Sequence, residues 1–95
     1  MKVAWLTSAR HSLRVKVAYI ADDNPAAARH VRHRIHSAVK NLGLFPDSGR
    51  PGAIAGTHEL IVPGLPYLVV YRVRGRRVEI LRVFHTSMNR SGAMN

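Results

Sequence analysis

The 95-residue sequence contains no cysteine, only 5 acidic residues and no long apolar run. Without cysteine the chain can form neither a disulfide framework nor a thiolate metal site. No apolar run approaches the roughly 18 residues that span a membrane, and residues 1–10 interrupt their apolar stretch too early for a secretory signal. We therefore expect one domain, residues 1–95, that works in the cytoplasm, because a chain this short has room for a single core.

Basic residues are what the sequence has in excess. Its 15 lysines and arginines against 5 acids give a formal net charge of +10, and 12 of the 15 are arginine. Guanidinium groups bind carboxylates and phosphates through paired hydrogen bonds and stack on flat rings. The charge predicts a polyanion or an acidic protein as partner, and composition alone does not choose between the two.

Apolar spacing predicts a first strand over residues 2–6, followed by a helix. The apolar stripe of this helix consists of Ala9, Leu13, Val17 and Ile20. Thr7 or Ser8 is expected to cap its first turn. Because Pro25 disfavours helical geometry in the residue before it, the helix should end near Asp23.

A second helix is predicted to begin at Asn24, with this side chain as the N-cap and Pro25 in the first helical position. Its core-facing stripe consists of Ala28, Val31, Ile35, Ala38 or Val39, and Leu42. Gly43 is expected to end the helix with a positive φ angle. So short a link between two helices predicts an antiparallel helical hairpin.

The second half of the sequence predicts a loop and three strands. Residues 44–56 contain two prolines and three glycines and are expected to form the loop. The predicted strands cover residues 58–62, 67–73 and 77–85. Gly75 and Arg76 fit a two-residue hairpin turn, and the polar residues 89–95 are expected to be a frayed tail.

The predicted fold is α+β, with the element order β-α-α-β-β-β. We expect the last three strands to form a small antiparallel sheet with the helical hairpin on one of its faces. The near-continuous apolar runs of the last two strands indicate central positions, and the first strand is expected at an edge.

Five segments of the sequence occur in an order that is typical of one family of bacterial proteins. They are Asn24-Pro25-Ala26-Ala27, Pro46-Asp47-Ser48-Gly49-Arg50-Pro51, His58-Glu59-Leu60-Ile61-Val62, residues 64–73 and residues 78–85. With these segments in order, the chain resembles the RelE/ParE toxins of type II toxin–antitoxin systems over nearly its whole length, from Val3 to about Met88. The resemblance implies the fold of that family, an adjacent antitoxin, and growth inhibition by the free toxin.

Within this superfamily the sequence is more similar to the ParE branch, whose members poison DNA gyrase, than to the RelE branch, whose members cleave mRNA on the ribosome. Aligned on Tyr71, the RelE-type strand carries a catalytic arginine where this chain has Leu68. The C-terminal catalytic tyrosine of that branch also has no counterpart, since no tyrosine follows Tyr71. Gly49-Arg50-Pro51 and residues 81–85 resemble ParE more closely.

A RelE-like nuclease remains the alternative. Metal-free RNA cleavage needs a base, an acid and cations for the developing phosphorane charge. Arg50, Arg72 and His85 are the candidate catalytic residues of this alternative, with His58 and Arg82 also able to contribute. The simpler interpretation of His85 is a strand-end histidine bonded to a neighbouring loop, and no catalytic residue is favoured.

The second predicted helix carries a cationic stripe opposite its apolar one. Its members are Arg29, Arg32 or His33, His36 and Lys40. No acid at i+4 compensates them, so this stripe is a candidate surface for nucleic acid or for an acidic antitoxin helix, beside the simpler role of a solubilising face. His30 and His36 fall on different faces of the helix; no metal site is predicted and no cofactor is expected.

Arginines also surround the final predicted hairpin. They are Arg72, Arg74, Arg76, Arg77 and Arg82. They outnumber the nearby acids Glu59 and Glu79, so solvent or a partner must satisfy most of them. The expected partner-binding residues here are Arg72, Arg74 and Arg82, whereas the aromatic residues Trp5, Tyr67 and Tyr71 are expected in the core or the sheet.

Three functional hypotheses follow. In the first, the chain is a ParE-like toxin that inhibits DNA gyrase without an active site of its own, and an acidic antitoxin neutralises it and links it indirectly to operator DNA. In the second, it is a ribosome-dependent mRNA endonuclease. In the third, it is a non-toxic relative that serves mainly as a corepressor with its antitoxin.

Overall fold

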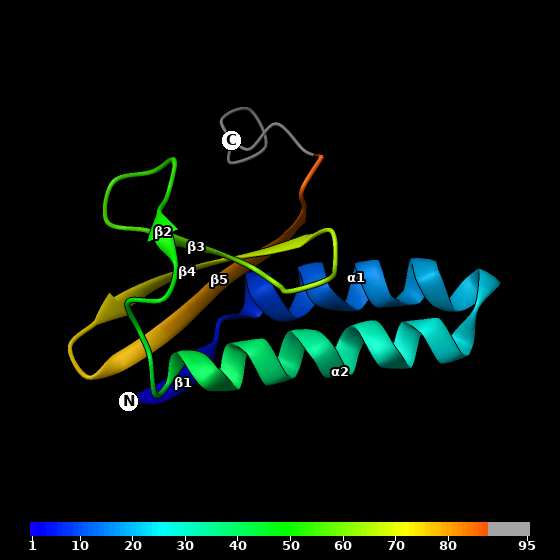
Figure 1. Ribbon diagram of the computed structural model, residues 1–95, viewed down its shortest axis with the longest axis horizontal. Coiled ribbons are helices and arrows are strands. Elements are labelled where there is room, and N and C mark those ends of the chain that lie inside the picture. The colour runs from blue at the N-terminus through cyan, green and yellow to red at the C-terminus, as the bar shows by residue number, and fades with distance from the viewer. Residues whose placement is uncertain (88–95) are drawn as a thin grey trace.

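The computed structural model describes residues 1–87, and the frayed tail predicted for residues 89–95 lies outside them. The elements are β1 (Lys2–Trp5), α1 (Thr7–Asp23), α2 (Pro25–Leu42), β2 (Arg50–Pro51), β3 (His58–Ile61), β4 (Tyr67–Arg74) and β5 (Arg77–His85). The strands form one sheet in the order β1-β5-β4-β3-β2. The two helices lie antiparallel, side by side, and pack against one face of the sheet (Figure 1). The predicted α+β class, the edge position of β1 and the central positions of β4 and β5 are confirmed.

Two features of the sheet differ from the prediction. The sheet is mixed, because β1 pairs with β5 in parallel while the other pairs are antiparallel. The predicted loop also contains β2, whose two residues Arg50 and Pro51 pair with Glu59 and His58. A strand of two residues has no apolar period that a sequence pattern could reveal, and its proline is tolerated because β2 is an edge strand.

The two helices begin differently. At α2, Asn24 Oδ1 accepts a hydrogen bond from the Ala27 N–H at 3.0 Å, so the predicted N-cap is confirmed. At α1, the predicted cap is wrong: Leu6 is the N-cap residue and no side chain caps the first turn. The Ser8 hydroxyl instead donates to the Leu81 carbonyl at 2.7 Å, because β5 lies beside this turn.

Gly43 ends α2 without the predicted positive φ; its φ is −63°. The residue is a glycine for a different reason. A Cβ atom here would lie 2.8 Å from the carbonyl oxygen of Met1 and 3.3 Å from Cγ2 of Val3. The absent side chain therefore lets the C-terminus of α2 approach β1.

The core lies between the helices and the sheet. The expected stripe of α2 is confirmed, with Ile35 and Leu42 0% exposed.

A β-bulge between Val70 and Tyr71 changes the register of β4 and β5, so that Val70 is opposite Arg82 and Tyr71 is opposite Ile80. The sheet contributes Val69, Tyr71, Val78, Ile80 and Val83 to the core against which the two helices pack. The other face has its own small cluster of Leu68, Val70 and Phe84.

No helix within residues 1–87 is long and apolar enough to cross a membrane.

Candidate functional site

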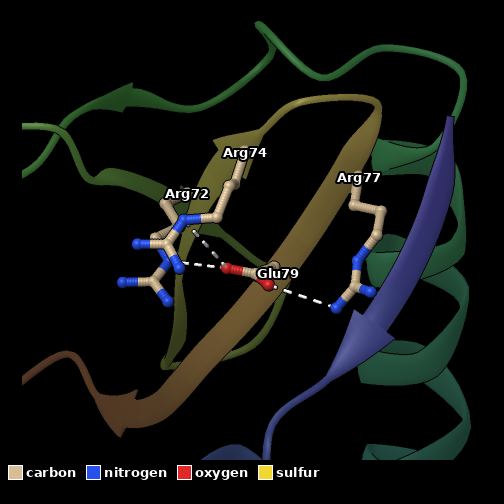
Figure 2. Close-up of polar contacts among 4 residues, drawn as sticks. All are labelled: Arg72, Arg74, Arg77 and Glu79. Carbon is tan, nitrogen blue, oxygen red and sulfur yellow. Dashed lines mark hydrogen bonds and ion pairs between the residues drawn. The ribbon is translucent and has the colours of Figure 1, made fainter.

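Three arginines surround the carboxylate of Glu79 on the sheet face opposite the helices (Figure 2). Arg72 Nε donates to Glu79 Oε1 at 2.7 Å, and Arg77 Nη2 donates to Oε2 at 3.2 Å. Arg74 Nε lies 4.0 Å from Oε1. We call these four residues the arginine cluster. One carboxylate among three guanidinium groups leaves it positively charged.

The hairpin of β4 and β5 positions the arginine cluster. Arg72 and Arg74 are two residues apart on β4 and so point to the same face, and they are opposite Glu79 and Arg77 of β5. Gly75, with a φ of +62°, supplies the first residue of the predicted two-residue turn between the strands.

The electrostatics of the arginine cluster favour an ionised Glu79. The hydrogen bond from Arg72 lowers the pKa of Glu79, and the positive charges of Arg72, Arg74 and Arg77 lower it further, against the opposing effect of burial. Only 8% of the Glu79 side chain is exposed, compared with 67% for Arg74 and 52% for Arg77. The acid therefore lies beneath cations that face the solvent.

A second ion pair lies near the outer edge of the same sheet. Arg50 Nη2 donates to Glu59 Oε1 at 3.3 Å, and the Ala53 N–H donates to Oε2 at 3.1 Å. This carboxylate therefore connects β3 both to β2 and to the loop that follows it.

The candidate catalytic residues of the nuclease hypothesis are not gathered at one place. Arg72 is opposite Glu79 near one end of β4, and His85 is opposite Tyr67 at the other end. Five residues of a strand separate the two positions, a distance of about 17 Å along the strand. Each arginine of this set is also held by its own carboxylate, Arg50 by Glu59 and Arg72 by Glu79.

His85 is bonded to the turn that follows β5. Its Nδ1 accepts a hydrogen bond from the Ser87 N–H at 3.2 Å and lies 2.7 Å from the Ser87 hydroxyl. Its ring meets Tyr67 edge-on, with 5.5 Å between the ring centroids. This is the arrangement expected of a strand-end histidine.

Arg82 lies on the sheet face opposite the helices, apart from the arginine cluster. Its Nε is buried and has no hydrogen-bond partner among residues 1–87, and its guanidinium carbon is 5.6 Å from the centroid of the Phe84 ring. Burial lowers the pKa of Lys16 in α1, and the positive charge of Arg82 lowers it further. Lys16 was missed from the sequence because it reaches Arg82 only through the packing of α1 on β5.

A hollow between β1 and the two helices has an apolar floor and a cationic rim. Trp5 and His36 line both of its adjoining parts, and their ring centroids are 5.1 Å apart. The apolar lining includes Val3, Leu13, Val17, Ala18, Val39 and Leu44, and the cations are Arg10, Arg14, Arg32 and Lys40. We call this hollow the Trp5 groove.

The cationic stripe predicted on α2 lies partly on the rim of the Trp5 groove. Arg32, His36 and Lys40 line the groove, whereas Arg29 does not. Burial lowers the pKa of His36, and the nearby Arg32 and His33 lower it further, which favours the neutral imidazole. The rim therefore owes its charge to arginine and lysine. Sequence reasoning missed its α1 members, Arg10 and Arg14, although their spacing of four places them on one helix face.

Histidines do not gather in the way a metal site requires. Within residues 1–87 no group of three or more histidine, aspartate or glutamate side chains is placed to hold a metal ion.

The sequence matches one family over nearly its whole length. Residues 3–90 match the model of the "ParE toxin of type II toxin-antitoxin system, parDE". Among curated proteins, the chain is 44% identical to "Putative toxin Y4kP" of Sinorhizobium fredii over 84 residues, which cover 88% of this chain and 86% of the relative. It is 29% identical to "Toxin RelE2" of Caulobacter vibrioides over 86 residues, which cover 90% and 96% of the two chains.

Solved structures of toxin–antitoxin systems share the fold. A chain of the chromosomal ParDE system from P. aeruginosa superposes with a TM-score of 0.83 at 24% identity, covering 92% of this chain and 97% of that one. A chain of the toxin–antitoxin complex RelBE2 from Mycobacterium tuberculosis gives a TM-score of 0.57 at 25% identity, with 88% of each chain covered.

Proposed function

Because this chain belongs to the ParE toxin family of type II toxin–antitoxin systems, we propose that it inhibits DNA gyrase and that an acidic antitoxin neutralises it. Leu68 is the observation that favours gyrase over mRNA as the target of the toxin. By its resemblance to the RelE branch, aligned on Tyr71, the chain has this leucine where that branch has a catalytic arginine. Leu68 is 0% exposed and packs with Val70 and Phe84. A buried leucine cannot supply positive charge to a reacting phosphate.

The placement of the other candidate groups also favours a binding protein over a nuclease. General acid–base catalysis needs its groups within hydrogen-bond reach of one substrate, and Arg72 and His85 lie near opposite ends of β4. A toxin without an active site acts by differential affinity: it stabilises the cleaved or stalled state of the gyrase–DNA complex that it binds more tightly.

The Trp5 groove supports an acidic antitoxin as the second partner. An amphipathic segment can place apolar side chains on the floor and carboxylates against Arg32 and Lys40. The M. tuberculosis relative was solved as a toxin–antitoxin complex. Bound in this way, the chain would be brought to operator DNA by its antitoxin.

The antitoxin proposal is tested by charge reversal on one helix. Arg32→Glu places an acid on the rim of the Trp5 groove, and Arg29→Glu makes the same charge change on α2 outside the groove. We expect the first variant to weaken the purified complex strongly and the second to change its dissociation constant little. Equal effects would show that the groove is not the docking site.

The gyrase proposal is tested with two assays on the same purified toxin. We expect the toxin to reduce DNA supercoiling by gyrase and to leave ribosome-bound mRNA intact. Codon-specific cleavage of mRNA with supercoiling unchanged would establish the endonuclease instead. Activity in neither assay, together with retained operator repression by the complex, would favour the corepressor hypothesis.

A further inference from the structure

Three cations lie side by side across the hairpin end of the sheet, on the face opposite the helices. Lys2 of β1 is directly opposite Arg77 of β5, and Arg77 is directly opposite Arg74 of β4. Residues in register project to the same face, and neighbouring strands are about 4.8 Å apart, so this row of positive charges is about 10 Å long. Like charges opposite each other destabilise a sheet, and the ion pairs of Arg74 and Arg77 with Glu79 offset only part of this cost. The stability of the fold therefore does not fully account for the row.

The neighbouring row does not reduce this net charge, because its one carboxylate is matched by a further arginine. It contains Ala4, Glu79 and Arg72 in the same cross-strand order. The two rows together hold four cations and one carboxylate, and that carboxylate already has guanidinium groups on both oxygens. A ligand that approaches this face therefore meets N–H donors and positive charge.

We propose that this surface, formed by Lys2, Arg72, Arg74 and Arg77 and here called the phosphate face, binds the sugar–phosphate backbone of duplex DNA. Guanidinium groups match phosphate oxygens with paired hydrogen bonds. Protein–DNA interfaces are more positively charged than protein–protein interfaces. A row of cations on adjacent strands fits a partner whose charges are closely and regularly spaced, as they are in duplex DNA.

The composition of the phosphate face argues against a protein as its partner. Protein interfaces concentrate their binding energy in tryptophan, tyrosine and arginine side chains that fill well-packed, desolvated pockets. The Trp5 groove offers a tryptophan in a hollow, whereas the two rows of the phosphate face contain five charged residues, one alanine and no aromatic residue.

The two surfaces lie on opposite sides of the sheet. Trp5 packs on the helix-facing core, and Lys2 and Ala4 alternate with it along β1. An antitoxin segment in the Trp5 groove therefore leaves the phosphate face open. The inference rests on the proposed function in one respect: the DNA concerned is the segment that gyrase holds.

The test measures binding of the full chain to fluorescent duplex DNA of random sequence by anisotropy, between about 50 and 200 mM salt. The variant Arg74→Gln/Arg77→Gln leaves Arg72 in place to pair with Glu79. The control Arg29→Gln/Arg34→Gln makes the same change in net charge on α2, at residues that line neither the Trp5 groove nor the phosphate face. We expect the hairpin variant to reduce the slope of log K against log salt by about 2, with affinity on the order of tenfold lower at about 0.1 M salt. The control should retain both values.

Unchanged DNA binding by the hairpin variant would overturn the proposal, and so would an equal loss of DNA binding in the control. If the hairpin variant lost gyrase inhibition but kept its DNA binding, the face would be assigned to a protein partner instead. Bare duplex contains no gyrase, so a failure of the gyrase proposal leaves this measurement unaffected. If circular dichroism shows the double variant unfolded, Arg74→Gln alone provides the test. Of the three arginines in the cluster, Arg74 lies farthest from Glu79. Its loss should reduce the slope of log K against log salt by about 1.

Discussion

The hydroxyl of Ser12 in α1 accepts a hydrogen bond from the backbone N–H of Val83 in β5 at 3.0 Å. β1 pairs with β5 only as far as Ile80. Beyond that point α1 covers the edge of β5. The Ser8 hydroxyl donates to the Leu81 carbonyl, and the Ser12 hydroxyl accepts from the Val83 N–H. Two serines one helical turn apart thus continue the hydrogen bonding that β1 leaves unfinished.

Replacing Ser12 with alanine should leave the Val83 N–H buried without a partner. We expect a loss of about 1–3 kcal/mol in the free energy of unfolding, measured by denaturant titration. Ser8→Ala is the matched control: its hydrogen bond is exposed, so water can replace the hydroxyl and the loss should be smaller. Equal losses would contradict the role of Ser12.

Tyr71 ties the loop after α2 to the sheet. Its hydroxyl donates to the Pro46 carbonyl at 2.8 Å and accepts from the Gly49 N–H at 2.9 Å. A Cβ on residue 49 would lie 2.6 Å from that oxygen, so only glycine leaves room for the contact.

Tyr71→Phe removes both of these hydrogen bonds while keeping the buried ring. We expect a loss of about 1–3 kcal/mol in stability and faster proteolysis within residues 44–56. Tyr19→Phe, at a side chain that is 78% exposed, should change neither quantity. A stable Tyr71→Phe variant with an unchanged cleavage rate would show that the loop is held by other contacts.

Ile35 tests the phase of α2. It is 0% exposed in the core, so Ile35→Ala should reduce the free energy of unfolding by about 2–5 kcal/mol through lost burial and a cavity. Ile54→Ala makes the same change at a side chain that is 45% exposed and should have an effect within about 0.5 kcal/mol. A harmless Ile35→Ala substitution would mean that α2 presents a different face to the sheet.

Glu79 predicts an acid dependence of stability. Its pKa is lowered in the folded state, chiefly by the Arg72 hydrogen bond, so at moderately acidic pH the unfolded chain binds more protons than the folded one. The stabilisation is therefore complete above the pKa of a free glutamate, about 4.3, and is lost as the pH falls through the lowered folded value. Thermal melts across this range should show a steeper fall for the wild type than for Glu79→Gln. Parallel curves would refute the coupling.

His85 separates the binding toxin from the nuclease in cells. Glutamine can retain a hydrogen bond near Ser87 but cannot act as a base, so His85→Gln should remain toxic if the chain has no active site. Loss of a catalytic acid or base commonly lowers turnover by about 10²–10⁴-fold. Growth that recovers on expression of this variant, at an equal protein level, would support the nuclease.

Local chemistry was enough to predict much of this protein from its sequence. The apolar period of α2, the Asn24-Pro25 start and the turn at Gly75 each depend on residues a few positions apart, so short-range rules identify them. The prediction of an anionic partner also comes from composition alone, through the excess of arginine, and it stays a prediction.

Tertiary structure decided the features that depend on residues distant in sequence. No local period encodes the contacts that produce three of these features. They are the parallel pairing of β1 with β5, the hydrogen bond from the Ser8 hydroxyl to β5, and the close approach of Gly43 to Met1. The same is true of both surfaces. Trp5 becomes the centre of a groove only when α1 and α2 pack beside β1, and Lys2 joins Arg74 and Arg77 only through the register of the sheet. Composition determines how much charge the chain carries; strand register determines where that charge is concentrated.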